Sequence, residues 1–258
     1  MKVREYHRDR PTTLVVLAGY MFGAWTFAPM CAELDDLRIL VIEDIGAADH
    51  GSVGGDYRDA IAAIEHALSS RRIDRFHLAG HSLGGFVAQE FAARHADRVE
   101  SLALLGTCHL SEFMGSHRVN ALPALDPLFD LEPDIFFRLS INAIFSPEFL
   151  ADPDSADTLR TAFDDNPPDR ERCRSQLIML ETLYEAGGRF PPIPVPCRAV
   201  FGLADGIVPP GWVRSLDRHF TTEPAWCPME SSHMFMYEKP VETAAILRDW
   251  IRQVSVNA

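Results

Sequence analysis

The segment GHSLGG, residues 80–85, contains the residue types that nucleophilic catalysis needs. It matches the pattern G-x-S-x-G, in which a serine lies on a tight turn between a strand and a helix, and small neighbours make room for that turn. An apolar run precedes the segment and a helical pattern follows it, as this pattern requires. We therefore predict that Ser82 is a nucleophile; the alternative is a structural serine in a Gly-rich turn. A phosphate-binding loop is disfavoured because the segment has neither a G-x-G-x-x-G pattern nor a Gly-Lys pair.

A serine hydroxyl becomes an effective nucleophile only when a base takes its proton and an acid orients that base. Asp205 lies in the turn after a predicted strand at 197–201, and His233 lies in the loop after a predicted strand at 225–229. In a parallel sheet both positions share one rim with Ser82, because each follows the carboxyl end of a strand. We predict the catalytic triad Ser82, Asp205 and His233. The alternatives are a solvated turn aspartate and a packing histidine.

An acyl-transfer site also needs backbone donors for the oxyanion that forms in the transition state. The N–H of Leu83, which follows the nucleophile, is one predicted donor. The second is predicted in the segment AGYMFGAW, residues 18–25, which follows the first core strand, with the Tyr20 N–H as the candidate. Gly19 and Gly23 allow this loop to approach the serine closely.

Short apolar runs alternate with longer helical patterns along the chain. The predicted strands are 13–18, 38–43, 76–79, 99–105, 197–201 and 225–229, and the predicted core helices are 56–69, 83–95 and 241–254. Continuous apolar runs of this length are typical of strands covered on both faces. The alternation predicts an α/β fold, a mostly parallel twisted sheet flanked by helices.

The region 109–188 interrupts this alternation, because it contains no convincing strand and is punctuated by prolines. Three helices are predicted there, at 132–145, 154–163 and 169–186. We predict a helical cap, or lid, at 109–188 over one edge of an α/β core formed by 1–108 and 189–258.

These motifs together resemble the α/β-hydrolase fold family, in its small cap-bearing esterase and enol-lactonase branch. The resemblance spans nearly the whole chain and rests on AG in the HG position, DIGAADHGS in the D-x-x-G-x-G-x-S position, GHSLGG, GLADGIVP and the H-x-x-x-x-E-x-P run that starts at His233. It implies a Ser82 nucleophile, a His233 base, an Asp205 acid and an oxyanion hole at Tyr20 and Leu83. Similar members include enol-lactonases, carboxylesterases, cofactor-free haloperoxidases and hydrolases of carbon–carbon bonds.

Three features depart from the family pattern. Ala18 replaces the histidine that usually precedes the oxyanion glycine, which removes the hydrogen bonds of that side chain behind the loop. Ser232 stands where glycine commonly precedes the catalytic histidine. Only residues 1–12 precede the first core strand, so the antiparallel strands at the start of the sheet should be shortened or partly absent.

Apolar and basic side chains in the loop after the first core strand and in the predicted cap region have two interpretations each. Trp25, Phe137 and Ile141 are candidates for the substrate pocket, although each is also a suitable core residue. The run DRERCRS supplies three arginines that would suit a carrier protein or an anionic substrate. The interleaved Asp169 and Glu171 favour a solvated, self-paired helix face.

Composition limits the partners. The net charge of −13 disfavours general binding to nucleic acid or to an anionic membrane. No apolar run is long enough to span a bilayer, and the amino terminus does not resemble a signal peptide. The five cysteines are scattered without a CxxC pair, so neither a disulfide framework nor a metal site is predicted. We expect a cytoplasmic monomer or homodimer with no cofactor.

The predicted function is that of a serine hydrolase that cleaves a small, mainly apolar ester or lactone through an acyl-enzyme on Ser82. The enzymatic alternatives are a thioesterase or methyl-esterase acting on a carrier-bound acyl chain, a carbon–carbon bond hydrolase and a cofactor-free haloperoxidase. A ligand receptor or signalling protein that uses the hydrolase fold is the non-enzymatic alternative.

Overall fold

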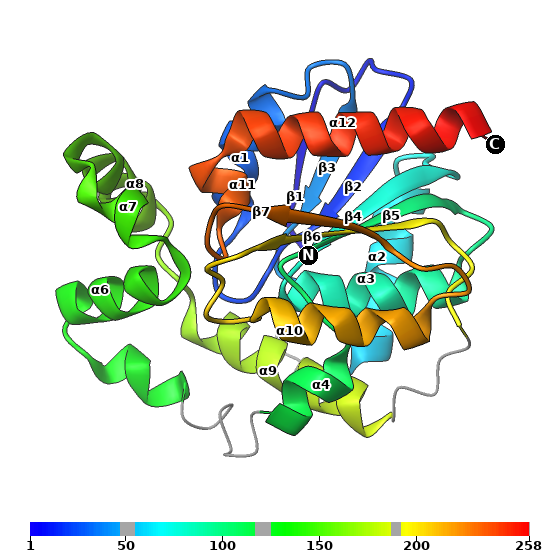
Figure 1. The fold of residues 1–258 in the computed structure, drawn as a ribbon. Helices are drawn as coiled ribbons and strands as arrows, with labels where there is room; N and C mark the ends of the chain where they lie inside the picture. Colours follow the sequence, from blue (N-terminus) through cyan, green and yellow to red (C-terminus); the bar gives the residue numbers. More distant parts are fainter. Residues whose placement is uncertain (47–54, 117–124, 187–191, 258) are drawn as a thin grey trace.

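The computed structural model describes residues 1–46, 55–116, 125–186 and 192–257 of the chain. Its centre is a sheet of seven described strands in the order β1-β3-β2-β4-β5-β6-β7 (Figure 1). All neighbours are parallel except β1 and β3, which are antiparallel. The strands are β1 (Val3–Tyr6), β2 (Thr13–Leu17), β3 (Arg38–Ile42), β4 (Phe76–His81), β5 (Val99–Leu105), β6 (Cys197–Gly202) and β7 (Ala225–Met229). The predicted α/β class and mostly parallel sheet are confirmed.

Alternate side chains of the strands enter two apolar clusters, one on each face of the sheet. On β2, for example, Val15 and Leu17 face one cluster, whereas Leu14 and Val16 face the other. Both faces are therefore buried, which explains the continuous apolar runs in the sequence.

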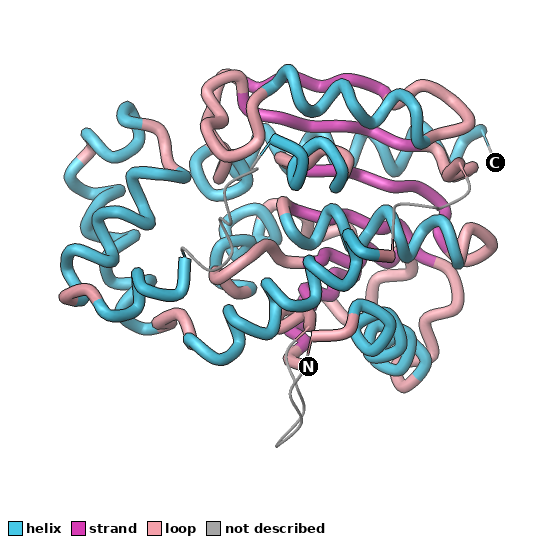
Figure 2. The backbone as a smooth tube through the Cα atoms, turned by 90° about the horizontal axis from the view of Figure 1, so that it is seen from below, coloured by secondary structure: helices cyan, strands magenta, loops and turns pink. Residues whose placement is uncertain are grey.

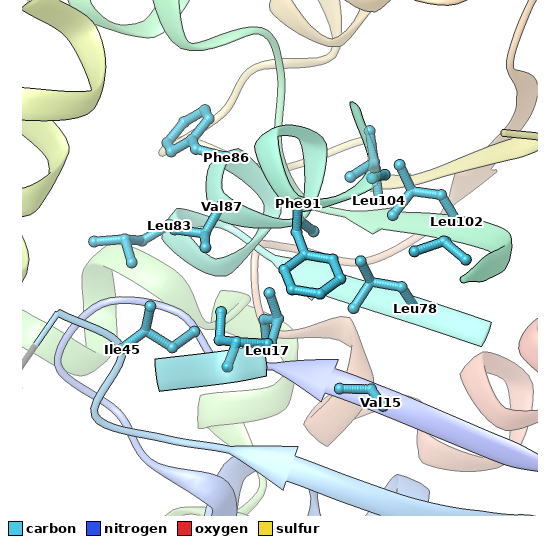
Figure 3. Packing of buried hydrophobic residues seen from close by; sticks show 14 of the residues in the cluster. Val15, Leu17, Ile45, Leu78, Leu83, Phe86, Val87, Phe91, Leu102 and Leu104 are labelled. Atoms are coloured by element: carbon cyan, nitrogen blue, oxygen red, sulfur yellow. The ribbon is translucent and has the colours of Figure 1, made fainter. Parts of the chain in front are cut away.

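Helices cover both faces of the sheet. The first face carries α2 (Tyr57–Ser69), α3 (Leu83–Arg94), α10 (Pro210–Val213) and the short 3-10 helix η3 (Arg214–His219). Figure 3 shows Phe91 of α3 beside Leu78 of the sheet. The second face carries η1 (Ala24–Phe27), α1 (Ala28–Ala32), α11 (Phe235–Glu238) and α12 (Pro240–Asn257).

The region between β5 and β6 is helical in its described parts. It contains α4 (Leu110–Ser116), η2 (Asp126–Asp130), α6 (Pro133–Ile144), α7 (Pro147–Ala151), α8 (Pro153–Asp165) and α9 (Arg170–Glu185). Helices α6, α7 and α8 lie beyond one end of the strands, and α9 runs under the core near α4 (Figures 1 and 2). Apolar side chains of α9 and α6 join the two core clusters. The division into a core and a cap at 109–188 stays a prediction, and its end at 187–188 lies outside the described residues.

Strand β1 is a short antiparallel strand at the start of the sheet, where shortened or partly absent strands were expected, although no sequence pattern gave its bounds. Its segment VREY is short, only partly buried and interrupted by charge. Glu5 forms ion pairs with Arg8 and with Arg38 of the neighbouring strand. A short edge strand of this kind lacks the apolar run by which the other strands are recognised.

Candidate active site

Ser82 stands at the junction of β4 and α3 with φ 51° and ψ −118°. A positive φ is uncommon for a residue other than glycine and has to be held by its surroundings. The Ser82 N–H donates to the carbonyl of Leu105 at 2.9 Å, and its carbonyl accepts from the Gly85 N–H and the Thr107 hydroxyl at 2.9 and 3.0 Å. A Cβ at Gly84 would lie 2.2 Å from the carbonyl oxygen of Leu17, so this turn packs too closely on β2 for any other residue.

Asp205 and His233 form a buried, hydrogen-bonded pair. The His233 Nδ1 lies 2.7 Å from the Asp205 Oδ2, and the two residues are only 4% and 3% exposed. The other carboxylate oxygen, Oδ1, accepts from the N–H groups of Ile207 and Val208 at 2.9 and 2.8 Å. Because both oxygens of Asp205 are held, its orientation is fixed. A proton on the His233 Nδ1 then leaves the Nε2 unprotonated as an acceptor.

Ser82 and His233 line the same cavity, which has a volume of about 280 Å³. Within the described residues no hydrogen bond joins Ser82 Oγ to His233. Such contacts are often long in unliganded enzymes and shorten when substrate binds. The described lining contains no Asp, Glu, Lys or Arg side chain. It includes Tyr20, Met21 and Phe22 from the loop after β2, Leu139, Ser140, Ala143 and Ile144 from α6, and Leu177 and Leu180 from α9.

The two predicted oxyanion donors lie beside this serine. Gly19 is so close to the turn that a Cβ on it would lie 3.3 Å from the Cβ of Ser82. No described residue accepts a hydrogen bond from the N–H of Tyr20 or Leu83. Burial, together with the neighbouring Cys173 thiol, raises the pKa of the Tyr20 phenol, so the side chain is neutral at neutral pH. The N–H groups of Tyr20 and Leu83 are therefore available to an anion bound in the cavity that both residues line.

His81, the last residue of β4, is a buried neighbour of His233. The His81 Nε2 lies 3.2 Å from the carbonyl oxygen of His233, and the two ring centroids are 4.7 Å apart. Burial lowers the pKa of His81 well below its usual value, and the nearby His233 adds to this effect. The ring is therefore neutral and can donate to that carbonyl, which supports the loop that carries His233.

Glu238 organises a second support that the sequence did not reveal. Its carboxylate accepts from the hydroxyls of Ser231 and Ser232 and from the N–H and hydroxyl of Ser146, at 2.5–3.1 Å. The hydroxyl of Ser232 also lies 2.7 Å from the carbonyl oxygen of Ile144, at the end of α6. The serine at the position where glycine is common thus links the His233 loop to the end of α6.

The structure does not place the three predicted pocket side chains on the described cavity lining. Trp25 packs edge-on against Phe22 and Tyr237, Phe137 packs against Phe163, and Ile141 is buried in the second core cluster. A different face of α6, with Leu139, Ser140, Ala143 and Ile144, borders the cavity. An apolar helix shows the same periodicity whichever of its faces meets the pocket, so the sequence could not distinguish them.

The arginines of the DRERCRS run are all engaged with acceptors of this chain. Arg170 pairs with Asp126 and Asp130 of η2. Arg174 pairs with Asp126 and with Glu171, its neighbour on α9. Arg172 points the other way, toward Asp44 and the carbonyl oxygen of Met21. The positive charge of these three arginines is therefore largely paired with carboxylates of the same chain.

The described residues contain neither a grouped set of metal ligands nor a membrane-spanning helix. In residues 1–46, 55–116, 125–186 and 192–257, no three His, Cys, Asp or Glu side chains are grouped as metal ligands would be. No helix in these ranges is both long and apolar enough to cross a bilayer. Cys108 and His109, at the boundary between the predicted core and the predicted cap, are both buried. Burial raises the pKa of the Cys108 thiol to about 12, so the thiol stays protonated at neutral pH.

Most of the DIGAADHGS motif, from residue 47 onward, lies outside the described residues.

Known proteins resemble this chain in sequence and in fold. A family model described as alpha/beta hydrolase family matches residues 14–246. A pimeloyl-(acyl-carrier protein) methyl ester esterase of Neisseria meningitidis is 28% identical over 231 residues, which cover 85% of this chain and 88% of that protein. The enol-lactonase of Burkholderia xenovorans superposes with a TM-score of 0.74 at 19% identity, over 97% of this chain and 96% of that one.

A second solved structure extends the comparison to a different activity. Epoxide hydrolase A of Mycobacterium thermoresistibile superposes with a TM-score of 0.77 at 17% identity, over 97% of this chain and 94% of that one. At such identities a structural likeness shows the fold alone. Proteins named for lactone and for epoxide chemistry share it, so the reaction has to be argued from the site.

Proposed function

Because the chain belongs to the alpha/beta hydrolase family, we propose that it is a serine esterase that hydrolyses small, mainly apolar carboxylic esters or lactones. One observation carries this proposal. A serine at a positive φ and a hydrogen-bonded Asp205–His233 pair meet at one apolar cavity. Such a combination is what acyl transfer by a serine needs, namely an exposed hydroxyl, an oriented base and a site from which water is largely excluded.

The reaction would proceed in two halves. In the first, Ser82 Oγ attacks the ester carbonyl while the His233 Nε2 takes the hydroxyl proton, and Asp205 stabilises the resulting imidazolium. The N–H groups of Tyr20 and Leu83 donate to the oxyanion. Collapse of the tetrahedral intermediate breaks the bond to the leaving oxygen, which receives the proton from His233. In the second half, water loses a proton to His233, attacks the acyl-enzyme and releases the acid and Ser82.

The cavity favours an uncharged, apolar acyl group. Its described lining is mostly aliphatic and aromatic and lacks formally charged side chains. A carboxylate or ammonium in the acyl chain would lose hydration there without gaining an ion pair, at a cost of several kcal/mol. Among esters of one alcohol, we expect kcat/KM to be higher for straight-chain acyl groups than for isosteric groups that carry a charge.

Replacement of the nucleophile tests the proposal. Ser82→Ala should lower kcat for the preferred ester by about 10⁴-fold or more, because the triad acts as a unit. Ser140→Ala is a matched control, since this second cavity serine has no assigned role in the chemistry and should leave kcat within about tenfold. Turnover of p-nitrophenyl esters of increasing chain length is the measurement. Near-normal activity of the Ser82→Ala protein would contradict the mechanism.

A second candidate is the ester of an acyl chain that is bound to a carrier protein. The name of the Neisseria relative supports it, because that protein is described as acting on such an ester. In this case the chain would enter the cavity and the carrier would stay outside. A kcat/KM at least about tenfold higher for the carrier-bound methyl ester than for the free methyl ester of the same acid would favour this candidate. Equal values would count against it.

A further inference from the structure

The loop that carries the Tyr20 N–H is held from outside by helix α9. Met21, the residue after Tyr20, has φ 69°, which is a strained conformation for a residue other than glycine. Its N–H donates to the Oε1 of Gln176 at 3.1 Å, and its carbonyl oxygen accepts from the Nη2 of Arg172 at 2.8 Å. Both polar groups of one strained residue are thus bound by side chains one turn apart on α9.

These two side chains are themselves fixed. Gln176 is only 3% exposed, so the position of its amide is set by packing. The guanidinium of Arg172 also donates to the Asp44 Oδ1 at 2.8 Å, and both side chains of this ion pair are largely buried. Breaking the hydrogen bonds of a buried amide or of a buried ion pair costs free energy. The bonded geometry of these two side chains is therefore well defined.

The loop has a particular need for this support. Ala18 offers no polar side chain behind the loop, where family members commonly have a histidine. Within the loop, the Phe22 N–H donates to the Tyr20 carbonyl at 2.7 Å. The next described hydrogen bond to another segment comes later, where the Ala24 N–H donates to the Oε2 of Glu43 at 2.9 Å. Between these points, the contacts of Met21 with α9 fix the peptide next to the Tyr20 N–H.

We propose that Gln176 and Arg172 are positioning residues of the oxyanion hole, through which helix α9 fixes the direction of the Tyr20 N–H. This inference rests on the proposed serine esterase function. It assigns the three arginines of the DRERCRS run to two classes. Arg170 and Arg174 tie α9 to η2, whereas Arg172 serves the reaction centre.

Positioning of the Tyr20 N–H stabilises the transition state more than the bound substrate. An oxyanion gains from a well-directed N–H, but an uncharged ground-state carbonyl gains little. Loss of the α9 contacts should therefore weaken tetrahedral adducts much more than it weakens substrate binding. A displacement of the donor by about 1 Å is enough to cost about a hundredfold in rate.

The test compares two inhibitors that share one apolar chain. An alkyl trifluoromethyl ketone forms a tetrahedral adduct with the serine and places a negative oxygen in the oxyanion hole, whereas the matching methyl ketone binds without one. In Gln176→Leu and in Arg172→Met, we expect the inhibition constant of the trifluoromethyl ketone to rise about tenfold or more, and that of the methyl ketone to stay within about twofold. The kcat for esters should fall while KM changes little.

Two further variants distinguish positioning from general damage. Gln176→Glu keeps an acceptor for the Met21 N–H and should restore most of the affinity for the trifluoromethyl ketone. Arg174→Met removes an arginine from the same helix without touching Met21 and should leave both inhibition constants unchanged. If the inhibition constants of both ketones rise by the same factor, or neither rises, in an active and folded variant, the positioning role is wrong. A wild-type protein that forms no adduct at Ser82 would instead overturn the proposed function.

Discussion

Ser82 keeps its backbone conformation because the residues around it leave no other. Its N–H and carbonyl are both bound, to Leu105 and to Gly85 and Thr107. The adjacent helix begins against β2 so closely that a Cβ at Gly84 would overlap two carbonyl oxygens of that region, at 2.2 and 2.5 Å. The strained backbone conformation of Ser82 is therefore maintained by packing between α3 and the sheet.

A substitution at Gly84 tests this packing. Gly84→Ala should lower the free energy of unfolding by about 1–3 kcal/mol, because the new methyl group meets backbone atoms that cannot move aside. Gly211→Ala is the matched control, since no atom lies within 4 Å of the Cβ that it would add. Urea denaturation measures both variants. Equal midpoints for Gly84→Ala and the wild-type protein would show that the turn is not constrained as described.

At the residue scale, the sequence predicted the reactive groups but not the residues that hydrogen-bond to their loops. Ser82, Asp205 and His233 were predicted from a local pattern and their order relative to the strands, and their catalytic roles remain predictions. Gln176 and Glu238 could not be assigned a role, because an amide or a carboxylate on a helix has no pattern that reveals its partner. Met21, the partner of Gln176, lies 155 residues away in sequence, and Ser146, one of the partners of Glu238, lies 92 residues away.

At the scale of elements, Glu238 of α11 joins three segments. Its carboxylate binds Ser231 and Ser232 in the loop of His233 and Ser146 between α6 and α7. The N–H of Met234 also donates to the carbonyl of Ile144 at 3.2 Å. The end of α6 and the His233 loop are therefore joined by several hydrogen bonds.

Removal of this carboxylate should disturb both stability and catalysis. Glu238→Ala leaves several donors without their acceptor, so the free energy of unfolding should fall by about 2–3 kcal/mol. The kcat for esters should fall about tenfold as the His233 ring loses its exact placement. Glu230→Ala, at an exposed position of the same loop, should change neither quantity. If the two variants behave alike in thermal unfolding and ester assays, the Glu238 network does not support the site.

Most elements of the core were predictable because they bury continuous apolar runs or regular helical faces. The six predicted strands and the three predicted core helices occur within a few residues of the expected bounds. The short α4, η2 and α7 were not predicted, since helices of one or two turns have too few residues to show a periodicity. The face of α6 that meets the cavity depends on tertiary packing, so it cannot be predicted from the helical pattern of one sequence.

At the scale of the whole molecule, the parallel sheet brings distant residues to one rim. Ser82 follows β4, Asp205 follows β6 and His233 follows β7, and β5 and β6 connect these positions across the sheet. The helices of residues 110–185 complete the site from outside. Helix α6 contributes part of the cavity wall, and α9 binds the loop beside Ser82.

The central claim is that Ser82 is a nucleophile activated by His233. The most direct measurement is the reaction of the protein with an alkyl fluorophosphonate, followed by intact-mass analysis and peptide mapping. We expect one adduct on Ser82 in the wild-type protein, none in Ser82→Ala, and strongly slowed labelling in His233→Ala, because an unactivated hydroxyl reacts slowly. A wild-type protein that stays unlabelled, or a Ser82→Ala protein that carries the same adduct, would contradict the account.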